Sequence, residues 1–380
     1  MTHDVLIIGA GPAGGAAALR LASAGIKLAV LEKERLPRRK PCRGALTPEA
    51  ADLLERGMEA VIDRQIFSVR TLFAWKQERI FKSAAHPILY LVERTRFDYQ
   101  LLQLALMRGT GNVEVKDNFL VRRVEEHRHG VTVVGKGGDR LTAKYIIAGD
   151  GVFSPTARRL GLKPSSAFGW AIDTDVEPAG ALFEEDAHRA TFNFECIPGG
   201  YGWIFPKQDY FSCGLCIWRS PVRLADHMED FLKRSFPAAD FRVTNRSIHP
   251  IPMFTGIGHI ATGRVCLAGD AAGLADPITG EGIRYALESG VLAADAVLES
   301  LSETRGKSGN LTATYVPSIR DGIGKHLDAI RRFAVPVYRK SPEFFYRKFF
   351  LTGGTYGTAF RNLARRMAGQ SDGASSARPL

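Results

Sequence analysis

The sequence predicts an α/β fold, in which a parallel sheet covered by helices is joined to an antiparallel sheet and to C-terminal helices. Three observations lead to this prediction. Residues 4–32 contain a strand, a glycine-rich turn, a helix and a second strand. Short strand-like runs such as "RATFNFECI" and "YFSCGLCIW" occupy the middle of the chain. Helical patterns such as "IRYALESGVLAADAVLES" dominate after residue 283.

The overall composition limits the classes of protein that the chain can be. Its 380 residues suggest two or three structural units. The formal net charge is +11, from 51 Lys and Arg against 40 Asp and Glu, which favours an anionic partner. No nucleic-acid motif supports DNA or RNA as that partner. No run of 18 apolar residues is present, so we expect any membrane contact to be peripheral.

The cysteines and the first residues indicate a cytoplasmic protein. Five scattered cysteines are an odd number, which argues against a disulfide framework. The small and apolar N-terminal residues imitate a signal peptide, but Asp4 stands where a leader would carry Lys or Arg. We interpret those residues as part of a nucleotide-binding unit instead.

This N-terminal unit has the Rossmann-like pattern of dinucleotide-binding proteins. After the strand "DVLIIG", Gly9 permits a tight turn, Gly11 lets a pyrophosphate approach the backbone, and Gly14 lets the following helix pack on the strand. The second strand, "KLAVLE", ends at Glu32, which can accept hydrogen bonds from a ribose. NAD and FAD both carry the adenosine diphosphate that this unit binds.

The stretch "RVCLAGDAAGLADPITGEGI" at residues 264–283 favours a flavin. Its strand ends just before Asp270, at the edge of a sheet where ligands bind. Asp270 could bond a ribityl chain, Gly280 and Gly282 would let backbone amides approach a planar ring, and the next helix would direct its positive end at that ring. For one loop alone, a turn that caps an ordinary helix is the favoured interpretation, and the N-terminal unit shifts the balance toward a flavin site. The segment "AKYIIAGDGVFSPTARRLG" repeats the strand and the Gly-Asp, followed by Ser154 and Arg158.

These three segments together resemble the FAD-dependent oxidoreductases typified by para-hydroxybenzoate hydroxylase. Within that superfamily, "KPCRGALTP", "ERTRFDYQLLQLA" and "PGGYGWIFPK" are similar to the geranylgeranyl reductase family. The resemblance covers roughly residues 1–300 and implies FAD as cofactor. The positions that match FAD-binding residues of the family are Ala13, Gly14, Glu32, Arg94, Val121, Asp270, Gly282 and Ile283.

The loop "PCRGALTP" matches the family's Cys-Gly-Gly stretch beside the flavin ring, and it implies cofactor contacts at Cys42, Arg43 and Gly44. Arg43 departs from the family pattern; its side chain could pair with a phosphate or narrow the ring cavity. Cys42 has three interpretations: a catalytic thiol, a small residue that sets the shape of the site, or an incidental buried cysteine.

Alternating aromatic residues in "YGWIFP" would place Tyr201, Trp203 and Phe205 on one face of a strand. Such a face is ordinarily sheet packing, but the resemblance implies that it lines a hydrophobic substrate cavity over the flavin. Cys213 and Cys216 have CxxC spacing inside an apolar strand, so a structural role is expected. The histidines show no ligand spacing, and no metal is inferred.

Basic and aromatic residues alternate in "RRFAVPVYRKSPEFFYRKFF" and "FRNLARRMAG". They predict either a solvated helix face or an amphipathic segment on anionic lipid. The last residues, "GQSDGASSARPL", are expected to be disordered. We expect a discontinuous FAD-binding domain at 1–67, 91–163 and 259–300, a substrate-binding sheet domain at 68–90 and 164–258, and a helical region with a disordered tail at 301–380.

The resemblance implies an enzyme that transfers hydride from reduced FAD to a carbon–carbon double bond of an isoprenoid or prenylated lipid. Cys42 and Tyr201 are the candidate proton donors, and the reductant is expected to be NADPH or a ferredoxin-like protein, since no second GxGxxG unit is present. A FAD-dependent monooxygenase or halogenase is the main alternative, although Tyr201 stands where halogenases carry a tryptophan. A non-catalytic prenyl-lipid-binding flavoprotein is the third.

Overall fold

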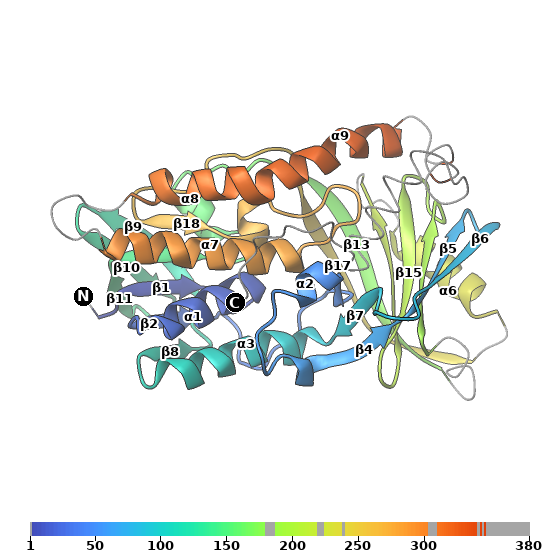
Figure 1. The fold of residues 1–380 in the computed structure, drawn as a ribbon, viewed down its shortest axis with the longest axis horizontal. Coiled ribbons are helices and arrows are strands. Elements are labelled where there is room, and N and C mark those ends of the chain that lie inside the picture. Colours follow the sequence, from blue (N-terminus) through green and yellow to red (C-terminus); the bar gives the residue numbers. More distant parts are fainter. Residues whose placement is uncertain are drawn as a thin grey trace.

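The computed structural model describes residues 2–178, 187–218, 224–237, 240–302, 310–339, 343 and 346. Two regions lie end to end along the long axis of the molecule (Figure 1). One is a parallel sheet covered by helices, and the other is a large, mainly antiparallel sheet. The mixed α/β prediction is confirmed, with a Rossmann-like parallel sheet, antiparallel sheets and C-terminal helices.

The parallel sheet has five strands in the order β18-β12-β1-β2-β8. Its strands β1, β2, β12 and β18 are fully buried aliphatic runs, as a sheet with helices on its faces requires. Helix α7 packs along α1 beside this sheet (Figure 1). The bounds are β1 Val5–Ile8, β2 Leu28–Leu31, β8 Val113–Lys116, β12 Tyr145–Ala148, β18 Val265–Leu267, α1 Pro12–Ser23, α3 Arg94–Gly109 and α7 Ile283–Ser302.

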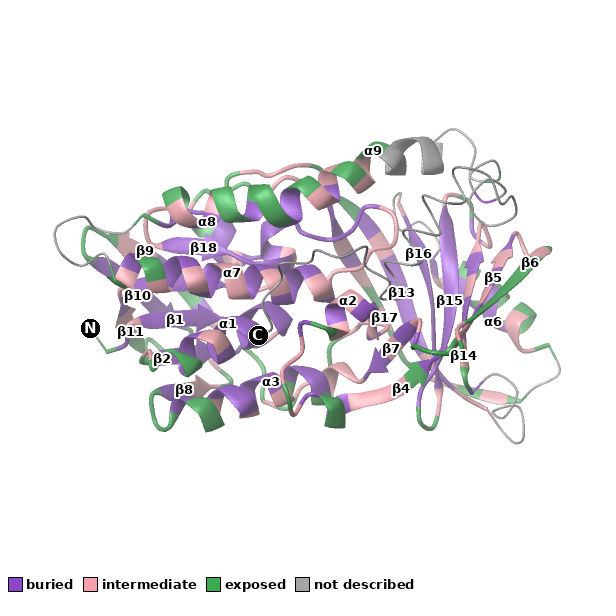
Figure 2. Ribbon diagram, in the orientation of Figure 1, coloured by how far each residue is buried: buried purple, intermediate pink, exposed green. Residues whose placement is uncertain are grey.

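The second sheet has seven strands in the order β17-β13-β16-β15-β14-β5-β6. Strands β15 and β16 are buried throughout, while β6 at the edge is largely exposed (Figure 2). Strand β14 pairs with β5 in parallel, so a segment from early in the chain completes a sheet built from later ones. The bounds are β5 Ser68–Phe73, β6 Gln77–Lys82, β13 Ser166–Pro178, β14 Arg189–Phe194, β15 Gly200–Pro206, β16 Phe211–Ile217 and β17 Phe241–Phe254.

Two three-stranded sheets and several short helices complete the fold. One small sheet has the order β3-β7-β4 and the other β11-β10-β9. Their bounds are β3 Ala45–Leu46, β4 Ile62–Ile66, β7 Leu89–Val92, β9 Val121–His127, β10 Gly130–Gly135 and β11 Arg140–Ala143. The short helices are α2 Pro48–Ala51, η1 Glu59–Val61, α4 Pro155–Arg159, α6 Leu224–Ser235 and the 3-10 helix η2 Gly269–Ala272.

Helices follow α7 along the top of the molecule in Figure 1: α8 Leu311–Ile319, a π-helical turn η3 Arg320–Gly324, and α9 Lys325–Arg339. The Tyr315 hydroxyl donates to the Leu267 carbonyl at 2.7 Å and attaches α8 to β18. Beyond Arg339, the rest of the basic aromatic stretch and the polar tail lie outside the described residues, apart from Glu343 and Tyr346.

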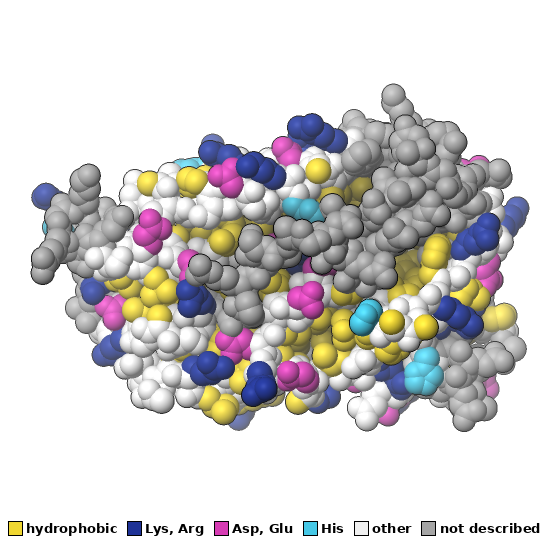
Figure 3. Space-filling view, in the orientation of Figure 1, with side chains coloured by type: hydrophobic (Ala, Val, Ile, Leu, Met, Phe, Trp, Pro, Cys, Tyr) yellow, Lys and Arg dark blue, Asp and Glu magenta, His cyan; other side chains and the backbone are white. Residues whose placement is uncertain are grey.

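No helix among the described residues is long and apolar enough to cross a bilayer. On the face that Figure 3 shows, Lys and Arg side chains are scattered among other types and do not form one patch. We retain the domain division as a proposal. Strands β5 and β6 belong to the seven-stranded sheet, whereas β7 pairs with β3 and β4.

Candidate functional site

The turn between β1 and α1 leaves the start of the helix open to a ligand. Gly9 has φ +95°, and a Cβ there would meet the backbone of Gly149, while a Cβ at Gly14 would overlap the Gly9 carbonyl. At Gly11 the nearest atom to an added Cβ is Nη2 of Arg38, 3.9 Å away. Gly11 is also the N-cap of α1 and gives it no side-chain cap. The helix therefore presents free backbone N–H groups, which suit a phosphate.

A buried charge network lies beside this turn. Glu32, directly after β2, accepts a hydrogen bond from the Ala10 amide at 2.9 Å and pairs with Nε of Arg38 at 3.2 Å. Arg38 also pairs with Asp98 at 3.0 Å, and Asp98 accepts two hydrogen bonds from Arg94 at 2.8 Å. Arg94 is thus linked through Asp98 and Arg38 to Glu32, the acid predicted to bind ribose. Arg38 and Asp98 are site residues that the sequence interpretation missed.

The second Gly-Asp loop also faces this turn. The Gly149 amide donates to the Ile8 carbonyl at 2.8 Å, and Asp150 Oδ2 accepts from the Thr156 amide at 3.0 Å. Burial raises the pKa of Asp150, and its Oδ1 is buried with no hydrogen-bond partner among the described residues. Ser154 caps α4, accepting a hydrogen bond from the Ala157 amide. Asp150 therefore has an acceptor atom available close to Gly9.

The stretch that favours a flavin forms η2 and then a turn at residues 276–282. Asp270 lies in η2, and its Oδ1 is 3.4 Å from the position of a Cβ at Gly282. Asp276 holds the turn by accepting from the Ile278 and Thr279 amides at 2.7 and 2.9 Å. Gly280 has φ +69°, a conformation that favours glycine. This places Asp270 against the turn that leads into α7.

The turn also contains Glu281, an acid whose pKa differs from its usual value. The Thr47 hydroxyl donates to its carboxyl at 3.1 Å. Burial raises the pKa of Glu281 to about 7, and the neighbouring Asp276 adds to the rise. A carboxyl that titrates near neutral pH thus lies beside the predicted ring-binding positions, Gly280, Gly282 and Ile283.

A polar cavity of about 300 Å³ lies between the two regions of the molecule. Cys42, Lys40 and Arg94 line it from one side, and Asp173 and Asp175 of β13 line it from the other. Burial lowers the pKa of Lys40, and the nearby Arg94 lowers it further. The cavity therefore begins at the predicted FAD contacts and extends to the seven-stranded sheet.

Lys207, directly after β15, lines the same cavity. It is buried, and its ammonium donates to the Val92 carbonyl at 2.9 Å. Burial lowers the pKa of Lys207. A Cβ at Gly44 would come within 3.1 Å of its Nζ, so Gly44 permits this close approach. The signal in the sequence was the lysine that ends "GWIFPK", which was not interpreted.

Arg43 projects toward the seven-stranded sheet, away from the charge network. Its guanidinium lies 5.4 Å from the ring centre of Tyr201 and 5.2 Å from that of Trp203. It donates hydrogen bonds to the Tyr201 hydroxyl and to the Thr279 carbonyl, and the Tyr201 hydroxyl also donates to that carbonyl. Arg43 therefore joins the 276–282 turn to the sheet and narrows the space between them.

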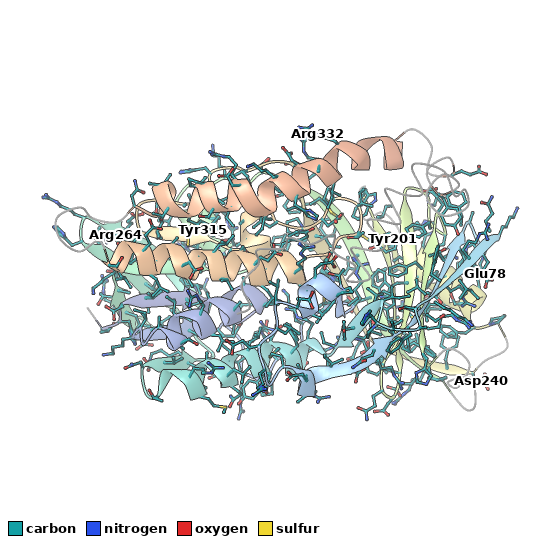
Figure 4. All side chains as sticks on the ribbon, viewed as in Figure 1. Glu78, Tyr201, Asp240, Arg264, Tyr315 and Arg332 are labelled. Atoms are coloured by element: carbon teal, nitrogen blue, oxygen red, sulfur yellow. The ribbon has the colours of Figure 1, made fainter. Side chains whose placement is uncertain are left out.

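Tyr201, Trp203 and Phe205 share one face of β15, as the alternation predicts. Figure 4 shows Tyr201 at the end of the sheet nearest the parallel-sheet region. Burial raises the pKa of Tyr201, so its hydroxyl keeps its proton. We call the packed rings on this face the aromatic cluster; its members are Phe192, Phe194, Tyr201, Trp203, Phe205 and Trp218.

The remaining predicted positions are spread around these centres. Val121 begins β9, and the Phe119 amide just before it donates to the Glu32 carbonyl at 2.8 Å, which places β9 near the ribose end. Ile283 begins α7. Cys213 and Cys216 are buried in β16, and burial raises the pKa of Cys216 to about 12. A thiol in that state is unreactive.

The arrangement fits FAD on physical grounds. An uncapped helix start suits the pyrophosphate, Glu32 suits a ribose, Asp150 offers a free acceptor, and the glycine turn near Asp270 leaves backbone exposed for a ring. The contact of each individual residue with FAD stays a prediction. Cys42 and Tyr201, the two predicted proton donors, lie in different surroundings, one on the polar cavity and one in the aromatic cluster.

Comparisons with known proteins agree with this arrangement. A family model described as FAD binding domain matches residues 2–321. Digeranylgeranylglycerophospholipid reductase 2 of Methanopyrus kandleri is 30% identical over 316 residues, which cover 80% of this chain and 78% of the relative.

Solved structures show the same fold. A geranylgeranyl bacteriochlorophyll reductase-like protein of Thermoplasma acidophilum superposes with a TM-score of 0.73 at 22% identity, over 97% of this chain and 92% of that one. A halogenase superposes with a TM-score of 0.72 at 17% identity, over 97% of this chain and 83% of that one. The chain therefore belongs to the FAD-binding domain family and, within it, is a FAD-dependent oxidoreductase of the geranylgeranyl reductase type.

Proposed function

We propose that this protein reduces carbon–carbon double bonds in the isoprenoid chain of a lipid or prenylated substrate. The observation that carries the proposal is the hydrogen bond from the Tyr201 hydroxyl to the Thr279 carbonyl. It brings the aromatic cluster directly against the turn predicted to hold the flavin ring. The relatives named digeranylgeranylglycerophospholipid reductases support the same substrate class.

Different parts of the site would bind different parts of the cofactor and the substrate. When bound, FAD supplies reducing equivalents to the double bond as hydride. The open start of α1, together with Glu32 and Arg94, would hold the adenosine diphosphate, and the 276–282 turn would orient the ring. The aromatic cluster excludes water and would contact the prenyl chain.

The isolated double bond also needs a proton, because an alkene alone accepts hydride poorly. Tyr201 is the donor that we favour, since its hydroxyl is protonated and lies at the turn. Cys42 is the alternative donor; its thiol lies on the polar cavity near Arg94. The reductant is proposed to be NADPH or a ferredoxin-like protein, and contact with anionic membrane through the basic C-terminal segment is part of the same proposal.

The proposal is tested by chemically reducing the FAD-loaded protein without oxygen and adding a digeranylgeranyl glycerophospholipid in detergent. Mass spectrometry should show a gain of two hydrogens for each reduced bond. Trp203→Gln should slow turnover while FAD stays bound, whereas Trp75→Phe, outside the aromatic cluster, should not. An unchanged lipid would contradict the proposal, and a product that gains oxygen in air would favour the monooxygenase or halogenase alternative.

A further inference from the structure

The surroundings of Arg43 differ from those of the other buried arginines at the site. Arg38 and Arg94 each form an ion pair with a carboxylate within 3.2 Å. Arg43 forms no ion pair with any carboxylate of the described residues; its recorded partners are the Tyr201 hydroxyl and the Thr279 carbonyl. Its guanidinium is enclosed by protein atoms, and the residue as a whole is half-buried.

An acid in the neighbouring turn does not form an ion pair with Arg43. Asp276 lies close enough to interact with Arg43 electrostatically. Its Oδ1, however, accepts hydrogen bonds from the amides of Ile278 and Thr279 in the turn, and Asp276 lies too far from Arg43 to form an ion pair with it. The rings of Tyr201 and Trp203 supply cation–π contact, which offsets only part of the loss of hydration.

A purely hydrocarbon ligand would make this arrangement unfavourable. A prenyl chain against the aromatic cluster would lie beside the guanidinium and offer it no hydrogen-bond acceptor. A carboxylate would do the opposite, because the planar guanidinium fork matches its two oxygens. The position is therefore suited to an anionic oxygen that arrives with the ligand.

We propose that Arg43 is a specificity-determining residue that binds a carboxylate of the substrate at the junction of the 276–282 turn and the aromatic cluster. This deepens the proposed function and rests on it. The preferred substrate class is then an isoprenoid that carries a carboxylate near the double bond to be reduced. Tyr201 positions the guanidinium through its hydroxyl and ring.

The test compares two ligands with the same carbon skeleton, farnesoic acid and farnesol, on the FAD-loaded protein. Binding is measured by calorimetry and by the change in flavin absorbance. The native chain should bind the acid about 10- to 100-fold more tightly than the alcohol, which corresponds to one charged hydrogen-bonded pair. Arg43→Gln should reduce this preference to about threefold or less, and the loss should fall mainly on the affinity for the acid.

Two further variants complete the design. Arg43→Lys keeps the charge but loses the fork, and should give an intermediate preference. Arg234→Gln removes an arginine that also lies over a tryptophan, 5.8 Å from the ring centre of Trp75, but that is exposed on helix α6. It should keep the full preference. Binding of farnesol by each variant shows that the variant is folded.

Four results would overturn the inference. Equal affinity of the native protein for acid and alcohol would do so while leaving the proposed function intact. A preference that survives in Arg43→Gln would place the anion elsewhere, for example at the polar cavity. A shift of the flavin reduction potential in Arg43→Gln, with no preference for the acid in the native protein, would identify reduced flavin as the anion. Failure to bind either ligand would contradict the proposed function as well.

Discussion

The site has a nucleotide end, around the turn between β1 and α1, and an aromatic end, formed by the aromatic cluster and Arg43. Both ends contain buried arginines, but the two ends differ in whether a carboxylate pairs with the arginine. At the nucleotide end, Asp98 joins Arg38 and Arg94 in one network. At the aromatic end, Arg43 lies over two rings and contacts a carbonyl and a hydroxyl. An arginine that is paired with a carboxylate of the protein is held in place as part of the fold. One without such a partner keeps its charge available for a ligand.

The largest effect is expected where the backbone of the nucleotide end is most crowded. Gly14→Val should abolish FAD retention, because even a Cβ there overlaps the Gly9 carbonyl and lies 3.2 Å from Cγ2 of Ile7. Flavin absorbance of the purified protein measures this. Gly322→Ala is the control, since no atom lies within 4 Å of its added Cβ. A Gly14→Val protein with a full complement of FAD would show that the close approach is not needed.

The second test removes the shared acid of the nucleotide end. Asp98→Ala leaves the buried Arg94 without its carboxylate and Arg38 with Glu32 alone, and it should lower the free energy of unfolding by about 3–5 kcal/mol. Asp295→Ala breaks a half-exposed pair with Arg20 and should cost about 1 kcal/mol or less. Urea denaturation measures both. Equal losses would mean that burial does not distinguish the two pairs.

The third test uses Glu281, the acid in the 276–282 turn, which lies between the two ends of the site. Because the folded state raises the pKa of Glu281 to about 7, from 4.5, it favours the protonated form. Stability should therefore fall as pH rises from 4.5 toward 7 and then level off. Since the side chain is only partly buried, we expect the native chain to lose about 1–2 kcal/mol of its free energy of unfolding across this pH range. Glu281→Gln should abolish that loss.

Urea denaturation at several pH values between those limits measures the effect of Glu281. Glu299→Gln, on the exposed side of α7, controls for the loss of one carboxylate. Parallel stability curves for the native chain and Glu281→Gln would show that Glu281 is not the responsible group.

The smallest effect is expected at the aromatic end. Arg43→Met replaces a cation that has no carboxylate partner by an apolar chain of similar length, so the free energy of unfolding should change by less than about 1 kcal/mol. The same urea measurement as for Asp98→Ala makes the comparison direct. A loss as large as that of Asp98→Ala would show that Arg43 is held as firmly as the nucleotide-end arginines.

The nucleotide-binding turn was predictable because its signals are local. The "GAGPAG" turn and Glu32 lie within one strand–helix–strand unit, and the local backbone explains why each of these residue types is needed. The shared face of Tyr201, Trp203 and Phe205 was predictable for the same reason, because alternation along one strand sets it.

The charge network was not predictable, since its members come from separate elements. Arg38 lies in the loop after β2 and Asp98 in α3, and only tertiary packing brings them to 3.0 Å. Lys207 likewise reaches the Val92 carbonyl across two sheets. For Arg43, the sequence indicated a departure from the family but not the direction of the side chain, which depends on the loop path between β2 and β3.

The parallel pairing of β14 with β5 has a consequence for synthesis of the chain. The polypeptide leaves the parallel sheet after β2, forms β5 and β6, and returns for β8 long before β14 has been translated. On the ribosome, one edge of the β5–β6 hairpin must therefore wait without its neighbour, open to pairing with other nascent chains. Fragments that end before β14 should therefore aggregate, and we expect that the N-terminal part of the chain cannot be produced alone.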